Sequence, residues 1–334
     1  MARYLVTGGC GSIGSVLVLR LLQSGHVVCS FDNCEDKLFT QIQSLPAAFT
    51  DRHKAFVGDV RDAGRLRQAC AGVDYVFHCA ALKHLDLCEY NPFEALKTNV
   101  QGTNNVIQAS ISAGVRGVVF ASSDKAVNPT STMGASKLLA ERVVISAKSH
   151  TGVGELKTSC VRFGNVWNTA GSVGKIFSRQ SRSGLPLTVT SSDMTRFFIT
   201  VEKAIALCEY AMNRMMGGEV FIANMGALNI AHLAEEFNRQ HQNSHAISFA
   251  NPRPGEKLYE ELFTSSEASR TGICDDYYVV LPEGLHFAET VDYWKAKDNF
   301  RMVPNSMSTL RSDDPSLLTT IDPASLIRMI EESS

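Results

Sequence analysis

The chain has 334 residues, of which 44% are hydrophobic and 20% are charged, an ordinary globular composition that is large enough for two lobes. Its 32 Lys and Arg nearly balance its 34 Asp and Glu, so the net charge is -2 and no basic field favours nucleic acid as a partner. The nine Cys lack CxxC or Cys/His metal-ligand spacing and no apolar run reaches about 18 residues, so we expect a reduced, cytoplasmic protein without metal, signal peptide or membrane segment.

Short apolar segments alternate with helical patterns in the first half of the chain. Near-continuous apolar strands are typical of a parallel sheet that helices cover on both faces. We therefore predict an α/β fold, a Rossmann doubly wound parallel sheet with a smaller C-terminal substrate-binding lobe. Strands are predicted at 3–8, 26–32, 55–59, 73–81, 117–123 and 156–166, and helices at 12–25 and 91–114.

Gly, Ser and Thr interrupt this pattern after about residue 165. We therefore predict a nucleotide-binding domain over 1–164 and a mainly substrate-binding lobe over 165–334, with a strand near 218–224 that rejoins the first sheet. Helices are predicted at 201–214 and 229–242, residues 245–263 are interpreted as strand, loop and helix, and the tail from about residue 270 is interpreted as mixed structure that ends in a polar loop and a helix.

The first predicted strand runs directly into a Gly-rich segment, TGGCGSIGS, at 7–15. Gly8, Gly11 and Gly14 provide a tight turn, close approach of the backbone to a pyrophosphate, and close helix packing. Such a turn alone is weak evidence, since it also occurs without a ligand. Asp32 at the tip of the second strand supports it, because a carboxylate there accepts hydrogen bonds from both ribose hydroxyls and repels a 2′-phosphate, which favours NAD over NADP.

Further cofactor contacts are expected where the third and fourth strands end. Asp59 is placed to meet the adenine, and the segment CAA at 79–81 is expected to line the cofactor. The other residues of these segments predicted to bind the cofactor are Ser12, Ile13, Val60, Ala80 and Ala81.

The segment SSDK, at 122–125, follows the fifth strand, at the edge of the sheet where α/β proteins build their sites. Asp124 and Lys125 are neighbours of opposite charge, an arrangement that shifts the two pKa values and suits acid and base chemistry. An ion pair that merely caps the strand is the structural alternative.

One turn of helix separates Met133 from Lys137, the interval at which many nicotinamide enzymes carry a Tyr and a Lys. Met has no proton to exchange, so either the acid and base lie elsewhere or the protein is inactive. A Tyr-x-x-x-Lys pair does occur at 293–297, but it lies beyond every cofactor motif and lacks a Ser on a neighbouring strand, which argues against its use.

These motifs carry a resemblance to a known family. Over nearly its whole length the chain resembles the extended short-chain dehydrogenases/reductases, and it is similar to the UDP-N-acetylglucosamine 4,6-dehydratases of bacterial polysaccharide biosynthesis. Some of those enzymes carry Tyr before xxxK, and a subgroup that includes membrane-anchored members carries Met; we expect this chain to correspond to their catalytic part. The similar segments are 78–103, 122–141, 162–173, 193–198 and 253–262.

The resemblance implies NAD-dependent oxidation at C4 of the sugar, loss of water across C5 and C6, and return of the hydride to C6. It implies that Asp124 protonates the departing C6 oxygen, that Lys125 is the C5 base, and that Ser123 donates to the C4 oxygen. Lys137 would bind the nicotinamide ribose, Lys83 and Asn99 would also belong to the cofactor site, and Met133 would pack against sugar or nicotinamide. The acceptor of the C4 hydroxyl proton stays open among Asp124, Ser123 with a water, and a Lys; retention at C5 is favoured over inversion.

The resemblance also implies a UDP-sugar site. Arg fits a diphosphate because its fork binds two oxygens at once. Residues expected to bind substrate are Lys83, Asn165, Ser172, Val173, Arg196 and Arg253, with Glu256 on the ribose hydroxyls.

Two other functions fit part of the pattern. A nucleotide-sugar epimerase needs the same NAD and Ser…Lys scaffold but no Asp–Lys elimination pair. A non-catalytic NAD-binding sensor or scaffold protein would explain the missing Tyr. By resemblance we also expect a homodimer or larger assembly, formed through helices 91–114 and 133–148.

Overall fold

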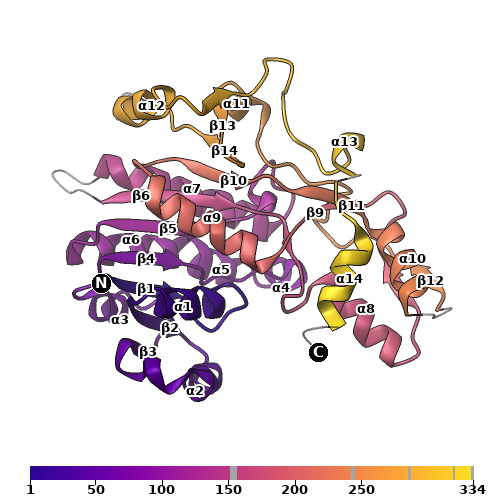
Figure 1. Cartoon of the computed structure of the whole chain (residues 1–334), viewed down its shortest axis with the longest axis horizontal. Coiled ribbons are helices and arrows are strands. Elements are labelled where there is room, and N and C mark those ends of the chain that lie inside the picture. The colour runs from indigo at the N-terminus through magenta and orange to yellow at the C-terminus, as the bar shows by residue number, and fades with distance from the viewer. Residues whose placement is uncertain (151–155, 242–244, 285–286, 319, 332–334) are drawn as a thin grey trace.

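The computed structural model of the chain describes residues 1–150, 156–241, 245–284, 287–318 and 320–331. Within these residues a ten-stranded sheet carries a smaller lobe at one end (Figure 1). The strand order across the large sheet is β15-β13-β14-β10-β6-β5-β4-β1-β2-β3.

The first half of the chain alternates strands and helices. Six strands pair in parallel in the order β3-β2-β1-β4-β5-β6, which confirms the predicted doubly wound α/β fold. The strands are β1 (Arg3–Thr7), β2 (Val27–Asp32), β3 (His53–Val57), β4 (Tyr75–His78), β5 (Gly117–Ala121) and β6 (Lys157–Arg162). The helices are α1 (Gly14–Gln23), α2 (Glu35–Ser44), α3 (Ala63–Cys70), α4 (Leu85–Tyr90), α5 (Pro92–Ala95), α6 (Gly102–Ala113) and α7 (Thr132–His150), with short helices η1 (Ala47–Arg52), η2 (Leu96–Gln101) and η3 (Asp124–Ala126).

Helices cover both faces of this sheet. Figure 1 shows α1 and α9 (Val201–Arg214) on the near face, with α3, α6 and α7 behind the strands. The burial of apolar side chains between these layers explains why the strands are apolar along almost their whole length. Fully buried examples are Leu5, Val6, Phe31, Val76, Val118, Phe120 and Val161.

The predicted helix at 91–114 is divided into three pieces. A single turn of π-helix, η2, joins α5 to α6, and this turn contains the buried Asn99. A π turn holds one residue more than an α turn and is common at functional sites. The reason for its position becomes visible in the hydrogen bonds of Asn99, described below.

The second half of the chain adds four strands to the large sheet. β10 (Val220–Ala223) pairs in parallel with β6, and it is followed at the sheet edge by an antiparallel group. The sequence pattern identified the tail only as mixed structure, because these strands are three or four residues long. The group consists of β13 (Thr271–Cys274), β14 (Tyr277–Val280) and β15 (Phe300–Met302), with α11 (Ser265–Ala268) and α12 (Ala288–Lys295) nearby.

The smaller lobe has its own core. Two small sheets, β11-β9-β7 and β12-β8, pack with helices around buried Trp167, Phe177, Phe198 and Phe237. The elements are β7 (Asn165–Val166), β8 (Leu187–Val189), β9 (Thr195–Ile199), β11 (Gly226–Asn229), β12 (Ile247–Phe249), α8 (Val173–Arg182), α10 (Ile230–Gln240), α13 (Pro315–Leu318) and α14 (Pro323–Glu331).

The helix predicted at the end of 245–263 is wrong. β12 is present, but the residues after it form a loop, which we call the 250–263 loop. Pro252 and Pro254 cannot donate backbone hydrogen bonds, and Gly255 has φ +73°, a left-handed conformation that favours glycine. The loop lies on the end of the Rossmann part, where Thr130 Oγ1 donates to the Gly255 carbonyl at 2.8 Å.

Within the described ranges no helix is long and apolar enough to cross a membrane.

Candidate active site

The Gly-rich turn is built so closely that glycine is required. Gly8 has φ +66°, and a Cβ on it would lie 2.7 Å from the Ala80 nitrogen. Gly11 N–H donates to the Gly8 carbonyl at 2.9 Å, and a Cβ on Gly14 would overlap that same oxygen. Ile13 directly precedes α1, so the turn leads into the N-terminus of a helix, a position that attracts phosphate.

Asp32 lies at the end of β2 beside this turn. Its carboxylate accepts hydrogen bonds from the backbone N–H groups of Cys10 and Cys34, both at 3.1 Å. The Gly-rich turn is further fixed by Gln41, whose side chain donates to the Gly9 carbonyl at 2.8 Å. Two backbone donors therefore orient the carboxylate at the edge where a ribose is expected.

Asp59, predicted to meet an adenine, is paired with Arg61 of the same chain. Arg61 forks onto both carboxylate oxygens and also contacts Glu94. The hydrogen bond from Arg61 lowers the pKa of Asp59 below its ordinary value. Val60, the next residue, is buried beside Gly102 of α6.

The Gly-rich turn and the loop after β4 both reach the small lobe at Ala170. Ser12 Oγ accepts from the Ala170 N–H at 3.3 Å, and Lys83 Nζ donates to the Ala170 carbonyl at 2.9 Å. Burial, and then the charge of Lys37, lowers the pKa of Lys83. These contacts join the two sides of the site.

Asn99 holds the loop that follows β4 and contains Ala80 and Ala81. Its side chain exchanges two hydrogen bonds with the backbone of Leu82, at 2.8 and 3.0 Å, and donates to Ser136 Oγ at 2.9 Å. The π turn η2 therefore fixes this loop against α7.

Lys137 is buried beneath β5. Its ammonium donates to the Ala121 carbonyl at 2.9 Å and lies 4.6 Å from the centre of the Phe120 ring. Burial lowers the pKa of Lys137 to about 8. Met133, one helical turn earlier, is 3% exposed and packs against Cys88, Ala95 and Leu85. Its side chain therefore packs against α4 and α5.

Ser123, Asp124 and Lys125 follow β5 and form one hydrogen-bonded group. Asp124 Oδ1 accepts from Ser123 Oγ at 2.8 Å and from Lys125 Nζ at 3.1 Å. Asp124 is fully buried, and its Oδ2 has no hydrogen-bond partner among the described residues. A buried carboxylate oxygen without a donor is costly, which marks this acid as a site for chemistry.

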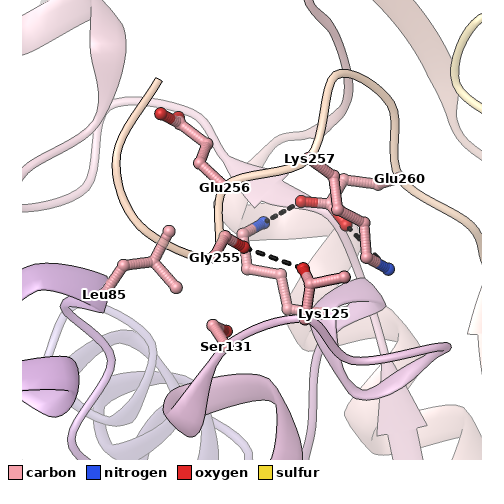
Figure 2. A pocket seen from close by; sticks show the side chains of 8 residues that line it. Leu85, Lys125, Ser131, Gly255, Glu256, Lys257 and Glu260 are labelled. Atoms are coloured by element: carbon pink, nitrogen blue, oxygen red, sulfur yellow. Dashed lines mark hydrogen bonds and ion pairs between the residues drawn. The ribbon is translucent and has the colours of Figure 1, made fainter. Parts of the chain in front are cut away.

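Glu260 is a site residue that the sequence analysis missed. It comes from the 250–263 loop, is 2% exposed, and its Oε1 lies 3.4 Å from Lys125 Nζ (Figure 2). Its backbone N–H donates to Ser312 Oγ at 2.9 Å. The signal was present in the segment RPGEKLYEEL, at 253–262, but a helix interpretation gave no reason to turn this Glu toward Lys125.

Lys125 is held by three oxygen atoms. In addition to Asp124 and Glu260, the amide oxygen of Asn165 in β7 lies 3.3 Å from Nζ. Burial alone would lower the pKa of Lys125, but the two carboxylates outweigh burial and raise it above its ordinary value. Lys125 is therefore an ammonium before substrate binds.

The two Arg predicted to bind the diphosphate differ in their surroundings. Arg196 is 4% exposed and donates to the carbonyls of Thr195, Lys257 and Leu258, while Glu256 lies 3.4 Å away. Arg253 is exposed and its Nε lies 3.8 Å from Asp86. Arg196 thus fixes the 250–263 loop, and only Arg253 presents its guanidinium to solvent.

Ser172 and Val173 lie at the N-terminal end of α8. Ser172 is the N-cap residue and Val173 is the first residue of the helix. The Ser172 hydroxyl is buried without a hydrogen-bond partner in the part of the chain that the structure describes.

The predicted residues thus fall into two neighbouring groups, one around the Gly-rich turn and Asp32 and the other around Lys125. The pocket beside Lys125 is lined by residues from three segments (Figure 2). The Tyr-x-x-x-Lys pair formed by Tyr293 and Lys297 lies in and just after α12, near the far edge of the large sheet, with Lys297 over the Tyr293 ring. Across the described residues no group of His, Cys, Asp and Glu could hold a metal ion. The lining residues of the pocket are Leu85, Lys125, Thr130, Ser131, Gly255, Glu256, Lys257 and Glu260.

Comparisons with known proteins define the class. The family of polysaccharide biosynthesis proteins matches residues 4–282, and the chain belongs to this family. An uncharacterized membrane protein of Methanocaldococcus jannaschii is 43% identical over 84% of this chain and 86% of its own length. A UDP-glucose 4-epimerase of Rickettsia rickettsii is 36% identical over 85% of each chain.

Solved structures share the fold. The structure of Pen from Bacillus thuringiensis is 35% identical, covers 99% of this chain and 98% of its own, and superposes with a TM-score of 0.88. More distant nucleotide-sugar enzymes of the same fold, 24% and 20% identical, were solved with NAD bound. Likeness of that degree shows the fold alone.

Proposed function

We propose that the protein catalyses NAD-dependent 4,6-dehydration of UDP-N-acetylglucosamine to a UDP-4-keto-6-deoxy-N-acetylhexosamine. The observation that carries the proposal is the group formed by Ser123, Asp124 and Lys125 after β5. It combines a buried acid with a free oxygen, a hydroxyl donor and a lysine, which are the groups needed for elimination. The resemblance of the surrounding segments to the dehydratases supplies the substrate.

The cofactor in this proposal is NAD, which accepts and returns a hydride when bound. Gly8, Gly11 and Gly14 would hold its pyrophosphate, and Asp32 its adenine ribose. The close approach of Gly8 to Ala80 and the two backbone donors on Asp32 fit that group. Lys137 would meet the nicotinamide ribose. The other proposed contacts are Ser12, Ile13, Asp59, Val60, Ala81, Lys83 and Asn99.

The missing Tyr leaves the C4 hydroxyl proton without its usual acceptor, and we assign that proton to Asp124 by way of Ser123. Ser123 Oγ lies 2.8 Å from Asp124 Oδ1, so the serine can accept the substrate proton while it gives its own to the carboxylate. Asp124 then holds, as a carboxylic acid, the proton that the C6 oxygen needs on leaving. One proton thus serves both steps, and Met133 takes no part.

Elimination requires removal of the C5 proton by Lys125. Oxidation at C4 makes that proton acidic, since the ketone stabilises the negative charge. The same lysine can return the proton to C5 after the hydride has reached C6, so the net change is loss of one water. Retention at C5 requires that it returns to the face from which it left.

The UDP portion would lie along the 250–263 loop and β7. Arg253 presents an exposed guanidinium for the diphosphate, Glu256 would take ribose hydroxyls, and Asn165 would meet the phosphate side. Ser172 and Val173 at the start of α8 would close that side of the site. Arg196 and Lys83 would support these residues through the loop contacts described above.

An epimerase is the second candidate, favoured by the relative of Rickettsia rickettsii named UDP-glucose 4-epimerase. Epimerisation inverts one centre and keeps the C6 hydroxyl, so it needs no acid above C6. Incubation with UDP-N-acetylglucosamine in deuterated water, followed by NMR, separates the candidates. A 4-ketone with deuterium at C5 supports the dehydratase, an inverted centre with an intact 6-hydroxyl supports the epimerase, and NAD binding without turnover indicates a sensor.

We also propose a homodimer through α4, α5 and α7. These elements expose Leu87, Tyr90, Phe93 and Leu139, and Leu96 at the start of η2 is exposed beside them. Tyr90 and Phe93 are 87% and 74% exposed. Because α4, α5 and α7 contact one another, these side chains lie on neighbouring elements, and exposed apolar side chains grouped in this way are typical of protein interfaces. Light scattering should give twice the chain mass for the wild type, and Phe93→Asp should shift it toward the monomer.

A further inference from the structure

Glu260 is a buried carboxylate that no step of the proposed dehydration uses. It reaches the pocket from the 250–263 loop, which follows Asp124 by more than a hundred residues in sequence (Figure 2). Its Oε2 has no hydrogen-bond partner among the residues that the structure describes. A side chain that merely braced the loop would use both oxygens, because an unpaired buried oxygen is costly.

The surroundings of Glu260 are cationic. Lys125 Nζ lies 3.4 Å from Oε1, Arg196 Nε 3.9 Å from the same oxygen, and Lys257 Nζ 3.8 Å from Oε2. Arg196 is also bound to Glu256 and to backbone carbonyls, and Lys257 donates to the Val127 carbonyl at 2.7 Å. Of these three cations, Arg196 and Lys257 thus have other protein partners. Lys125 differs, because its other partner, Asp124, acts on the substrate in the proposed reaction.

A base at C5 must be an amine, yet Lys125 is an ammonium between two carboxylates. Asp124 cannot take its proton, since in the proposed reaction Asp124 already holds the proton from the C4 hydroxyl. Glu260 Oε1 is the other carboxylate oxygen within reach of Nζ. Burial raises the pKa of Glu260 above that of an ordinary carboxyl group, so this carboxylate accepts a proton more readily than an exposed one would.

We propose that Glu260 is the proton partner of Lys125, an assignment that rests on the proposed dehydration. An N–H bond of the Lys125 ammonium breaks and an O–H bond forms on Glu260, so the ion pair becomes an amine and a carboxylic acid. The amine removes the C5 proton and later returns it to C5, and Glu260 then gives its proton back. No outside acid or base is consumed, and Glu260 acts through Lys125 as a positioning residue.

Glu260→Gln tests this assignment, with Glu261→Gln as the matched control at the next position. Glu261 contacts Asn128 and Thr309 and lies outside the proposed machinery. Mixing holoenzyme with UDP-N-acetylglucosamine should produce reduced nicotinamide at the control rate, because C4 oxidation does not involve Glu260. Its decay, which follows elimination, should slow by about 10²-fold.

The pH profile separates proton transfer from a structural role. In wild-type enzyme the proton stays between Lys125 and Glu260. The decay rate of reduced nicotinamide should therefore depend on pH no more than it does in Glu261→Gln. In Glu260→Gln the Lys125 proton must leave to solvent, and the decay rate should rise with pH. Glu260→Asp keeps an acceptor and should recover the flatter profile. If the decay rate in Glu260→Gln fell by the same factor at every pH, or did not fall at all, the inference would be overturned.

A second readout does not depend on turnover. In enzyme labelled with 13C at the lysine ε-carbon, Lys125→Arg identifies the Lys125 signal, and its titration reports the pKa directly. Asp124, Arg196, Lys257 and Glu260 are the charged groups that face Nζ. Glu260→Gln should lower the pKa of Lys125 relative to Glu261→Gln, and an unchanged titration would contradict the linkage. If wild-type enzyme makes no ketone while the titration shifts, the proposed function fails and the proton linkage stands.

Discussion

Two buried ionic clusters lie near the end of the large sheet, and they differ in how completely their atoms are paired. In one, Arg162 forks onto Glu141 and Glu267, with four hydrogen bonds between 2.7 and 2.9 Å. In the other, Asp124 and Glu260 flank Lys125, and each acid keeps one oxygen without a hydrogen bond within the described residues.

The difference separates structure from chemistry. The Arg162 cluster joins β6, α7 and α11, and all its carboxylate oxygens are used, so it can only hold those elements together. The Lys125 cluster leaves proton-accepting atoms free and lines a pocket. Burial of charge alone therefore does not identify an active site; incompletely paired acids that line a pocket are the stronger signal.

The largest effect is expected when the Lys125 cluster is broken. Asp124→Asn should reduce ketone formation by about 10³-fold, because the amide can neither accept the C4 proton nor protonate the C6 oxygen. NAD binding, followed by fluorescence quenching, should stay within about threefold of wild type. Wild-type activity in this variant would remove Asp124 from the mechanism.

Breaking the Arg162 cluster should lower the stability of the fold and leave the catalytic activity unchanged. Glu267→Gln leaves Arg162 with one charged partner and should lower the free energy of unfolding by about 3 kcal/mol, measured by urea denaturation. Arg162 holds the pKa of Glu267 down to about 2, below its ordinary 4.5, even though burial opposes this. This stabilisation is complete above about pH 4.5 and is lost as the pH falls toward 2, so the variant and wild type should converge in acid.

The activity of the folded variant is the control for this comparison. Turnover per folded Glu267→Gln molecule should match wild type, because the cluster touches no reacting atom. A selective loss of elimination would show that the two clusters are coupled.

Lys137 gives a smaller, pH-dependent effect at the cofactor side. Burial lowers its pKa to about 8, so its charge is present at pH 7 and is lost as the pH rises through 8. The rate of reduced nicotinamide formation should fall roughly tenfold between pH 7 and 9. The decline should be absent in Lys137→Met, whose rate is low throughout; a persistent decline would assign it to another group.

The smallest effect is expected at the position that first raised doubt about activity. Met133→Leu conserves volume in the cluster with Cys88 and Ala95, and should cost less than about 1.5 kcal/mol. Ketone formation should change by less than about threefold. A loss comparable to that of Asp124→Asn would return Met133 to the chemistry.

The sequence predicted the Rossmann part well because its signals are local. The strand–turn–helix around Gly8 and the apolar strands depend on neighbouring residues, and the structure has them within a few positions. The segment SSDK could be located for the same reason, since the end of a parallel strand fixes where its side chains project.

The prediction failed where distant segments decide the outcome. Glu260 reaches Lys125 only because two prolines and Gly255 prevent a helix and because Arg196 binds the loop carbonyls. The contacts of Arg196 with those carbonyls appear only in three dimensions, and its predicted contact with the diphosphate stays a prediction. β13, β14 and β15 were missed because strands of three or four residues carry little periodic signal.

The π turn η2 constrains how this segment of chain can change length. An α-helix advances about 100° per residue, so the extra residue rotates everything after it by that angle relative to α5. Ala95 before the turn packs on Met133, while Asn99 within it holds the loop after β4. Deletion of one residue between 96 and 101 would restore a regular helix. Either the packing of Ala95 on Met133 or the hydrogen bonds of Asn99 to the loop could then be kept, but not both. The two ends of the helix are therefore in register with the site only at their present spacing.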